Sequence, residues 1–315
     1  MVGIAEIWAA RPLVAEVALR TPLVRLQAEG APAEVYLKLE NLQPLGAFKL
    51  RGAHCALRRL PPERLAHGVL TASAGNMAQG AAYGARRLGV PCTVVAPETI
   101  PDTKARAIER LGGTIRRVSR ERWWQTFQER TFPGLEDAAF LHAFDDPAVM
   151  AGNGTIGLEI LEDLPDVDAV VIPFGGGGLA AGIATALRAL KPDTAIYAAE
   201  VETAAPLSAA FAAGAPREIA FTPSFVDGIG SSAVFPRMWE LARTLLDGAL
   251  VATLAEARAA IRLLAERQRV IAEGAAACAV AAALSGAAGS GKVVAVVSGG
   301  NLDPGVLAEI LTEGA

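Results

Sequence analysis

The feature that most constrains the fold is an alternation, along the chain, of short runs rich in β-branched residues with longer runs rich in Ala, Leu and Arg. The short runs predict buried strands, and the longer runs have the length of helices. Regular alternation of the two is typical of an α/β protein with mainly parallel sheets. We expect strands at residues 34–40, 69–73, 92–97, 114–119, 169–174, 195–201 and 292–298, and helices near 76–88, 103–111, 152–163, 178–190, 255–270, 274–285 and 304–312.

Composition narrows the class of protein. The 315 residues are 52% hydrophobic, which predicts a large core and, by ordinary domain size, two lobes between which the chain crosses more than once. A net charge of −4 without a basic run argues against nucleic acid and acidic membranes as partners. Two uncharged runs, 169–187 and 274–291, are too rich in Gly, Ala or Pro to predict membrane spans.

The cysteines and the N-terminus indicate the compartment. Cys55, Cys92 and Cys278 have neither metal-ligand spacing nor an even number for pairing, so we expect reduced core residues in the cytoplasm. The first ten residues lack the basic start and cleavage site of a signal peptide.

Four loops that join a strand to a following segment are rich in small or polar residues: "TASAGNMAQG", "IPFGGGGLAAG", "FVDGIGSS" and "VVSGGNLDPG". Ligands of open α/β sheets bind at such junctions. Gly175, Gly176, Gly177 and Gly178 would let a phosphate approach the backbone and the N-terminus of the next helix. The alternative is a tight strand-to-helix turn, but four glycines in a row after a buried strand favour phosphate binding. The pattern matches neither GxGxxG nor GxxxxGK[ST], so a dinucleotide or nucleoside triphosphate is disfavoured.

Lys49, within "PLGAFKLRGA", is one of only five lysines among 29 basic residues. An amine can lose its proton when desolvated and then attack a carbonyl, which a guanidinium does not do. A reactive amine together with a phosphate cradle suggests pyridoxal 5′-phosphate, whose aldehyde forms a Schiff base with lysine.

The motifs "KLENLQPLGAFKLRGA", "TASAGNMAQG", "IPFGGGGLAAGI", "VDGIG", "AEGAAA" and "VVSGGNLD" occur in the order and spacing of the fold type II pyridoxal-phosphate enzymes. The chain most resembles the serine/threonine dehydratase (threonine ammonia-lyase) and serine racemase family, from Thr21 to about Gly305. The resemblance implies two lobes, each with a mainly parallel sheet flanked by helices, and a cofactor in the cleft between them. It implies a large cofactor-binding domain of residues 1–65 and 144–315 and a small domain of residues 66–143.

The resemblance also implies roles for individual residues. Lys49 is the Schiff-base lysine, and Ser298 faces the pyridine nitrogen, where a neutral hydroxyl favours elimination over transamination. The alternative for Ser298 is an ordinary turn residue. Glu273 is expected near the ring, and its alternative is an acid that stabilises a helix start. Phe48 is expected to pack on the cofactor ring, with an ordinary core position as the alternative. Asn76 is expected to bind the ring hydroxyl, with a helix cap as the alternative. The phosphate is expected to contact Gly175, Gly176, Gly177, Gly178 and Leu179.

The loop formed by Ser73, Ala74, Gly75, Asn76 and Met77 is expected to hold the substrate carboxylate. Met77 departs from the family pattern, since many relatives have a histidine there. His54, His67 and His142 fall in none of the loops, so surface or core roles are expected. Trp123 and Trp124 are expected to be core or lid residues.

A metal site and a regulatory domain are not expected. Relatives with a divalent cation bind it through a Glu, a carbonyl and an Asp, but here Glu200 and Ala204 are followed by Pro206 in place of the Asp. The sequence ends soon after "SGGN", which leaves no room for the domain through which isoleucine inhibits biosynthetic relatives.

The resemblance therefore implies a cytoplasmic, homodimeric or larger dehydratase of amino-acid catabolism that eliminates water from L-threonine or L-serine. Alternatives are an amino-acid racemase, β-replacement as in cysteine synthase, and a binding module without activity, against which the intact Lys49 argues. Ala74 argues against racemisation, because relatives that racemise serine carry a hydroxyl there. Phe174 and Phe225 flank the loops and leave open a bulkier β-hydroxy amino acid.

Overall fold

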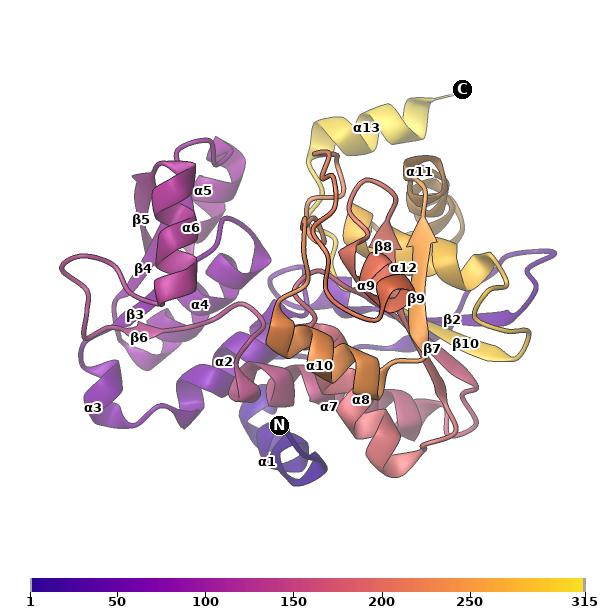
Figure 1. Cartoon of the computed structure of the whole chain (residues 1–315), viewed down its shortest axis with the longest axis horizontal. Helices are drawn as coiled ribbons and strands as arrows, with labels where there is room; N and C mark the ends of the chain where they lie inside the picture. The colour runs from indigo at the N-terminus through magenta and orange to yellow at the C-terminus, as the bar shows by residue number, and fades with distance from the viewer. Residues whose placement is uncertain (1, 314–315) are drawn as a thin grey trace. The chain divides into compact units, whose positions relative to one another are not determined.

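The computed structural model describes residues 2–313 and divides them into two compact units (Figure 1). The small unit comprises residues 2–18 and 49–153, and the large unit comprises residues 19–48 and 154–313. The chain therefore crosses from one unit to the other three times, once between Phe48 and Lys49. The domain boundaries after residues 65 and 143 stay a prediction.

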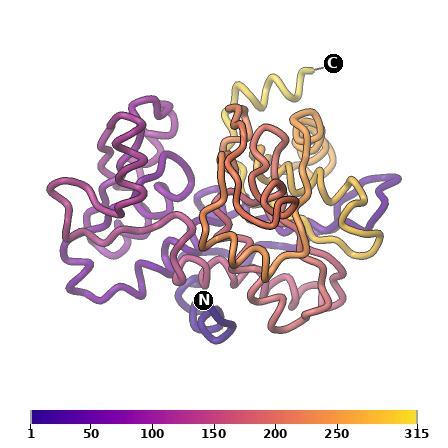
Figure 2. The backbone as a smooth tube through the Cα atoms, viewed as in Figure 1, coloured from indigo at the N-terminus to yellow at the C-terminus, as the bar shows by residue number. Residues whose placement is uncertain are grey.

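The large unit is built on a six-stranded sheet in the order β1-β2-β10-β7-β8-β9. Only β1 is antiparallel to its neighbour. Figure 2 shows the segment 19–48, in indigo and purple, beside the yellow C-terminal segment, where β2 pairs with β10. Every residue of β7 is buried, which is typical of a parallel strand covered on both faces. The strands are β1 (Leu23–Arg25), β2 (Glu34–Lys38), β7 (Ala169–Pro173), β8 (Ala195–Val201), β9 (Gly248–Ala252) and β10 (Lys292–Val296).

Helices of the large unit pack on this sheet. The α12 helix is mostly alanine, so its backbone approaches β7, β8 and β10 closely, and α11 packs outside it (Figure 1). The α11 helix ends in a π-helical turn, Leu264–Gln268, where the sequence predicts continuous α-helix. The helices are η1 (Glu40–Leu42), α8 (Gly178–Leu190), α9 (Pro206–Ala213), α10 (Pro236–Leu245), α11 (Leu254–Leu263), α12 (Gly274–Leu284) and α13 (Pro304–Thr312).

The small unit contains a four-stranded parallel sheet in the order β5-β4-β3-β6. Side chains alternate between its faces, so Val69 and Val94 pack in the cluster that contains the alanines of α4, whereas Leu70 and Val95 pack with Trp123 of α6. Its strands are β3 (Val69–Ala72), β4 (Cys92–Pro97), β5 (Gly113–Val118) and β6 (Ala139–Phe140), and its helices are α1 (Ile4–Ala15), α2 (Lys49–Arg59), α3 (Pro62–Leu65), α4 (Asn76–Leu88), α5 (Asp102–Arg110) and α6 (Arg120–Glu129).

The α7 helix (Pro147–Asp163) begins in the small unit and ends in the large one. The sequence predicts only the part of this helix from residue 152 onward, although Pro at the first helical position, as Pro147 is here, is typical of a helix start. Of the helices within residues 2–313, none is both long and apolar enough to cross a membrane. The predicted α/β fold with mainly parallel sheets is confirmed.

Candidate active site

The loops after β7 and β10 lie at one edge of the large unit's sheet. The two strands are neighbours and run parallel, so their carboxyl ends meet at the same edge. The glycine loop, Gly175–Gly178, follows β7, and Ser298 follows β10. Both predicted cofactor-binding segments of the large unit are therefore brought together by strand order, as the ligand sites of open α/β sheets are.

The glycine loop has no room for side chains at two of its positions. A Cβ on Gly177, whose φ is +89°, would lie 2.9 Å from the Phe174 ring, and a Cβ on Gly175 would lie 3.1 Å from the carbonyl oxygen of Gly228. The α8 helix starts directly after Gly177, has no acidic residue in its first turn and receives no side-chain cap. A backbone loop that leads into a helix N-terminus in this way is suited to a phosphate group.

The segment before Lys49 is fixed to the segment after β10 by backbone hydrogen bonds. Phe48 N donates to the carbonyl oxygen of Ser298 at 2.9 Å, and Gly300 N donates to that of Gly46 at 2.8 Å. Gly46 has a φ of +70°, and a Cβ there would lie 2.7 Å from Asn301 Oδ1. The glycine of "LGAFK" is therefore needed for this close approach. Phe48 and Ser298 are both buried.

Glu273 lies beside Ser298. Its backbone N–H donates to the carbonyl oxygen of Gly299 at 2.9 Å, and a Cβ on Gly299 would lie 2.6 Å from Glu273 Oε1. Glu273 is the N-cap residue of α12, but its side chain does not cap that helix. The carboxylate lies in space that Gly299 leaves, and both interpretations of Glu273, as a site residue and as an acid that stabilises the helix start, stay open.

Lys49 is the first residue of α2 in the small unit. Its Nζ donates to the carbonyl oxygen of Ala143 at 2.8 Å. The α4 helix crosses the backbone here, since a Cβ on Gly80 would lie 3.3 Å from the carbonyl oxygen of Lys49. Asn76 begins α4 one turn earlier, and Gly75 is the N-cap residue. The predicted lysine and the predicted substrate loop are thus held in one unit.

The rest of the substrate loop is a turn with an apolar end. Ser73 Oγ accepts a hydrogen bond from Gly75 N at 3.3 Å. Ala74 packs against the core cluster that includes Met77, which is only 2% exposed. The roles of all these residues in binding cofactor and substrate stay predictions.

Glu200, part of the metal site that the sequence disfavours, has other partners. Its two carboxylate oxygens accept hydrogen bonds from Leu207 N at 2.8 Å and Ser208 N at 2.7 Å, at the start of α9. Burial raises its pKa to about 7. Among residues 2–313, no group of three or more His, Cys, Asp or Glu side chains is arranged to hold a metal ion.

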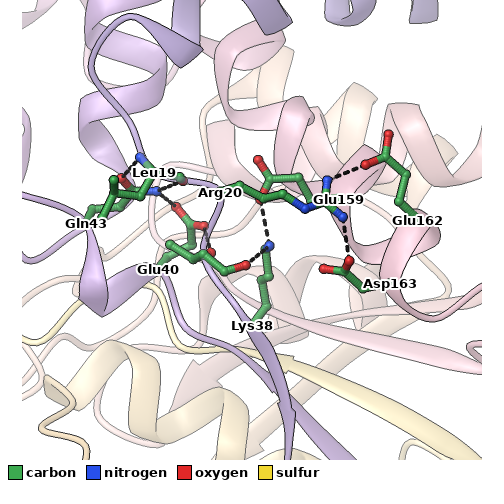
Figure 3. A network of polar contacts seen from close by, with 9 residues as sticks. Leu19, Arg20, Lys38, Glu40, Gln43, Glu159, Glu162 and Asp163 are labelled. Atoms are coloured by element: carbon green, nitrogen blue, oxygen red, sulfur yellow. Dashed lines mark hydrogen bonds and ion pairs between the residues drawn. The ribbon is translucent and has the colours of Figure 1, made fainter.

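A second lysine, Lys38, belongs to a buried polar network (Figure 3). Its Nζ lies 2.6 Å from Glu159 Oε2 and 2.6 Å from the carbonyl oxygen of Thr21. Glu40 accepts hydrogen bonds from Thr21 Oγ1 and from Gln43. This network joins β2 and the chain before it to the end of α7, and it is structural rather than part of the site.

The histidines are where the sequence predicts, outside the loops. His54 is buried, with Nε2 2.9 Å from Glu16 Oε2, and burial lowers its pKa. His67 is exposed. His142 is buried but adjoins Ala143, the Lys49 partner. Sequence reasoning missed this contact, because a backbone carbonyl has no signature in the sequence.

Comparisons with known proteins show similarity along nearly the whole chain. The model of a family described as pyridoxal-phosphate dependent enzyme matches residues 14–299. An L-threonine ammonia-lyase of Thermotoga maritima is 37% identical, covering 100% of this chain and 79% of that protein, and one of Geobacter sulfurreducens is 42% identical, covering 89% and 70%.

Solved structures are similar over the same extent. The processed form of threonine deaminase isoform 2 from Solanum lycopersicum superimposes with a TM-score of 0.89 at 32% identity, covering 98% of this chain and 91% of that one. Maize serine racemase superimposes with a TM-score of 0.87 at 31% identity, covering 99% and 97%.

Proposed function

Because the chain belongs to the family of pyridoxal-phosphate dependent enzymes, we propose that it is a dehydratase (ammonia-lyase) that acts on a β-hydroxy amino acid such as L-threonine or L-serine. The products are a 2-oxo acid and ammonia. The observation that carries this proposal is the Lys49 amine, held at the start of α2 in the unit that also presents the loop from Ser73 to Met77. The names of the two L-threonine ammonia-lyases support the choice of reaction.

The residues present fit the cofactor. The glycine loop and the N-terminus of α8 offer backbone donors for its phosphate, the buried Ser298 offers a hydroxyl for the ring nitrogen, and Lys49 offers the amine for its aldehyde. When bound, pyridoxal phosphate supplies an electron sink for the bond broken at Cα.

The protein's own groups perform the remaining tasks. The backbone donors and the Ser73 hydroxyl of the substrate loop bind the substrate carboxylate and orient the Cα–H bond toward Lys49. Lys49 Nζ takes up the Cα proton as a general base and, as the ammonium, returns a proton to the departing β-hydroxyl group, which leaves as water. The unsaturated product then takes up water and releases ammonia.

Racemisation of the same substrates is a second candidate, and the similarity to maize serine racemase supports it. Lys49 could remove the Cα proton in either reaction. The two differ in whether a second acid can return a proton to the other face of Cα, which Ala74 cannot do.

The cellular setting forms part of the proposal. We propose that the protein works in the cytoplasm in amino-acid catabolism, as a homodimer or larger homo-oligomer, with a small amino acid as substrate and with neither nucleic acid nor membrane as partner. Three free, buried cysteines and a net charge of −4 support this setting. Burial raises the pKa of Cys55 to about 11 and that of Cys92 and Cys278 to about 12, so these thiols are unreactive.

Release of 2-oxo acid by the purified holoenzyme tests the reaction. We expect 2-oxobutanoate from L-threonine and pyruvate from L-serine, each with one equivalent of ammonia. A protein that binds pyridoxal phosphate but releases 2-oxo acid from no β-hydroxy amino acid would contradict the proposal.

A further inference from the structure

Two buried side chains of the large unit cover Gly177, the third residue of the glycine loop. A Cβ on Gly177 would lie 2.9 Å from both Cε2 and Cζ of the Phe174 ring, and 3.1 Å from Cε of Met238. Phe174 is 2% exposed and Met238 is 1% exposed. The ring and the methyl group therefore occupy the place that a side chain at residue 177 would take.

The direction of the loop's N–H groups depends on the backbone conformation of Gly177. Its φ of +89° and ψ of −9° lie in the left-handed region, and the right-handed helix α8 follows at once. A left-handed residue next to a right-handed one turns successive N–H groups toward one point, which makes a concave site for an anion. Glycine adopts positive and negative φ about equally readily, so the neighbours of Gly177 must select this conformation.

Phe174 is fixed through its backbone and through its ring. Its N–H donates to the carbonyl oxygen of Ala199 at 2.9 Å, which extends the pairing of β7 with β8. Its ring lines a small cavity together with Gly177 and with Met238 and Leu241 of α10. All residues that line this cavity are apolar or glycine, so close packing holds the ring against Gly177.

The α10 helix, which carries Met238, packs on α8 and is held at its far end (Figure 1). Arg188 of α8 donates through Nε to the carbonyl oxygen of Leu245, the last residue of α10, at 3.0 Å. Trp239 of α10 packs edge to face on Phe211 of α9, with ring centroids 5.3 Å apart. These contacts fix the position from which Met238 reaches Gly177.

We propose that Phe174 and Met238 are positioning residues for the phosphate of pyridoxal 5′-phosphate, because they keep Gly177 in its left-handed conformation and so keep the loop's N–H groups directed at the phosphate. This inference rests on the proposed phosphate site at the glycine loop and, through it, on the proposed function. Neither side chain has a hydrogen-bond donor to offer a phosphate, so both act through the backbone of Gly177.

A comparison of two ligands tests the proposal. Pyridoxal and pyridoxal 5′-phosphate have the same ring and the same aldehyde and differ only in the phosphate group. The full chain, freed of cofactor, is titrated with each, and the pyridoxal Kd divided by the pyridoxal 5′-phosphate Kd defines the phosphate discrimination. General loosening of the protein changes both Kd values alike, so the discrimination reports the loop. We expect Phe174→Leu to lower it by about 10-fold, the equivalent of one hydrogen bond to a charged group.

The second position and a matched control complete the series. Met238→Ala should lower the discrimination several-fold, whereas Met238→Leu nearly conserves the volume and should fold normally and keep most of the discrimination. The control is Phe211→Leu, the same exchange in the same unit, at a ring that contacts α10 through Trp239. It should leave the discrimination unchanged.

A double variant tests the contact itself. Gly177→Ala places a methyl group against the Phe174 ring and should lower the discrimination on its own. Leucine lacks the Cε2 and Cζ atoms that lie in the way, so Gly177→Ala should cause a smaller loss when it is combined with Phe174→Leu than when it is introduced into wild type. The effects of residues in contact are not additive, and this coupling is the expected sign of the contact.

The outcomes separate the inference from what it rests on. Wild-type discrimination in Phe174→Leu, or an equal loss in Phe211→Leu, would overturn the inference. If Gly177→Ala also keeps the wild-type value, the phosphate binds elsewhere, and the proposed phosphate site fails together with the inference. If the variants behave as expected but the holoenzyme releases no 2-oxo acid from any β-hydroxy amino acid, the inference stands and the proposed dehydratase function is wrong.

Discussion

Lys38 and Lys49 come from the same part of the chain but have different surroundings. Lys38 is fully buried and ion-paired with Glu159 at 2.6 Å (Figure 3). Lys49 is half-buried and donates to a neutral carbonyl, that of Ala143. Separating a buried ion pair costs several kcal/mol, whereas exchanging one neutral hydrogen bond for another costs about 1 kcal/mol or less.

The difference indicates what distinguishes a structural lysine from a chemical one. Burial alone does not, because the more buried of the two is the ion-paired Lys38 and not Lys49, the proposed Schiff-base lysine. A lysine that must bind a ligand covalently needs a partner that it can leave cheaply. The following predictions test this comparison.

The largest effect is expected from Lys49→Met. Loss of the amine should remove the visible absorbance of lysine-bound pyridoxal phosphate and lower the rate of 2-oxo acid release by about 1,000-fold or more, because the proposed base is gone. Thermal unfolding should change little, since the hydrogen bond from Lys49 Nζ to the Ala143 carbonyl oxygen is made to a neutral group. Lys191→Met, at the C-terminal end of α8, is the control and should retain activity. Wild-type activity in Lys49→Met would end the proposed role.

The matching change, Lys38→Met, should reverse the pattern. The Glu159 carboxylate would remain buried without its cation, so the free energy of unfolding should fall by about 3–5 kcal/mol, measured by urea denaturation. The folded protein should keep its kcat. The double variant Lys38→Met, Glu159→Leu should recover most of the loss, because neither charge remains. A double variant no more stable than Lys38→Met would show that the pair is not what holds this region.

Much of the large unit could be predicted from its sequence. The run Ala169–Pro173 is uniformly apolar and is followed by four glycines, so a buried parallel strand, a close backbone approach and a helix start follow in order. The strands β1, β6 and β9 were not predicted, since they are short or at sheet edges and form through pairing with neighbours. Helices α1, α2, α3, α6, α9 and α10 were also not predicted.

Part of the candidate site could likewise be predicted from the sequence, and part could not. Glycines and Lys49 could be predicted because the chemistry requires those residue types at those positions. The hydrogen bond from Lys49 Nζ to the Ala143 carbonyl oxygen could not, because a backbone carbonyl has no signature in the sequence. Trp123 and Trp124 were expected only as core or lid residues.

The carboxylates of the large unit allow a second comparison. Glu159 is paired with the Lys38 amine, whereas Glu200 accepts hydrogen bonds from the backbone N–H groups of Leu207 and Ser208. Burial raises its pKa from 4.5 to about 7. A raised pKa contributes stability that is fully present below pH 4.5 and is lost as the pH rises through about 7. The loss should amount to about 3 kcal/mol.

Unfolding measured from pH 5 to pH 8 in wild type and Glu200→Gln isolates this effect. The stability of wild type relative to the variant should fall across this range. Parallel pH profiles of the two proteins would show that Glu200 titrates normally in the folded state.

The smallest expected effect concerns Ala74. It tests whether the enzyme can racemise its substrate when no acid faces Lys49 across Cα. Racemisation by a two-base route needs a proton donor on the face of Cα opposite Lys49, and a methyl group supplies none. With L-serine we therefore expect pyruvate and little D-serine, and Ala74→Ser should raise the D-serine share several-fold. Ala74 is half-buried at the edge of its cluster, so one added hydroxyl should change stability by about 0.5 kcal/mol or less. Chiral analysis of the products is the measurement, with Ser73→Ala as the control for donation by the neighbouring hydroxyl. If wild type forms D-serine as fast as pyruvate, a group other than residue 74 must donate the proton on the face of Cα opposite Lys49.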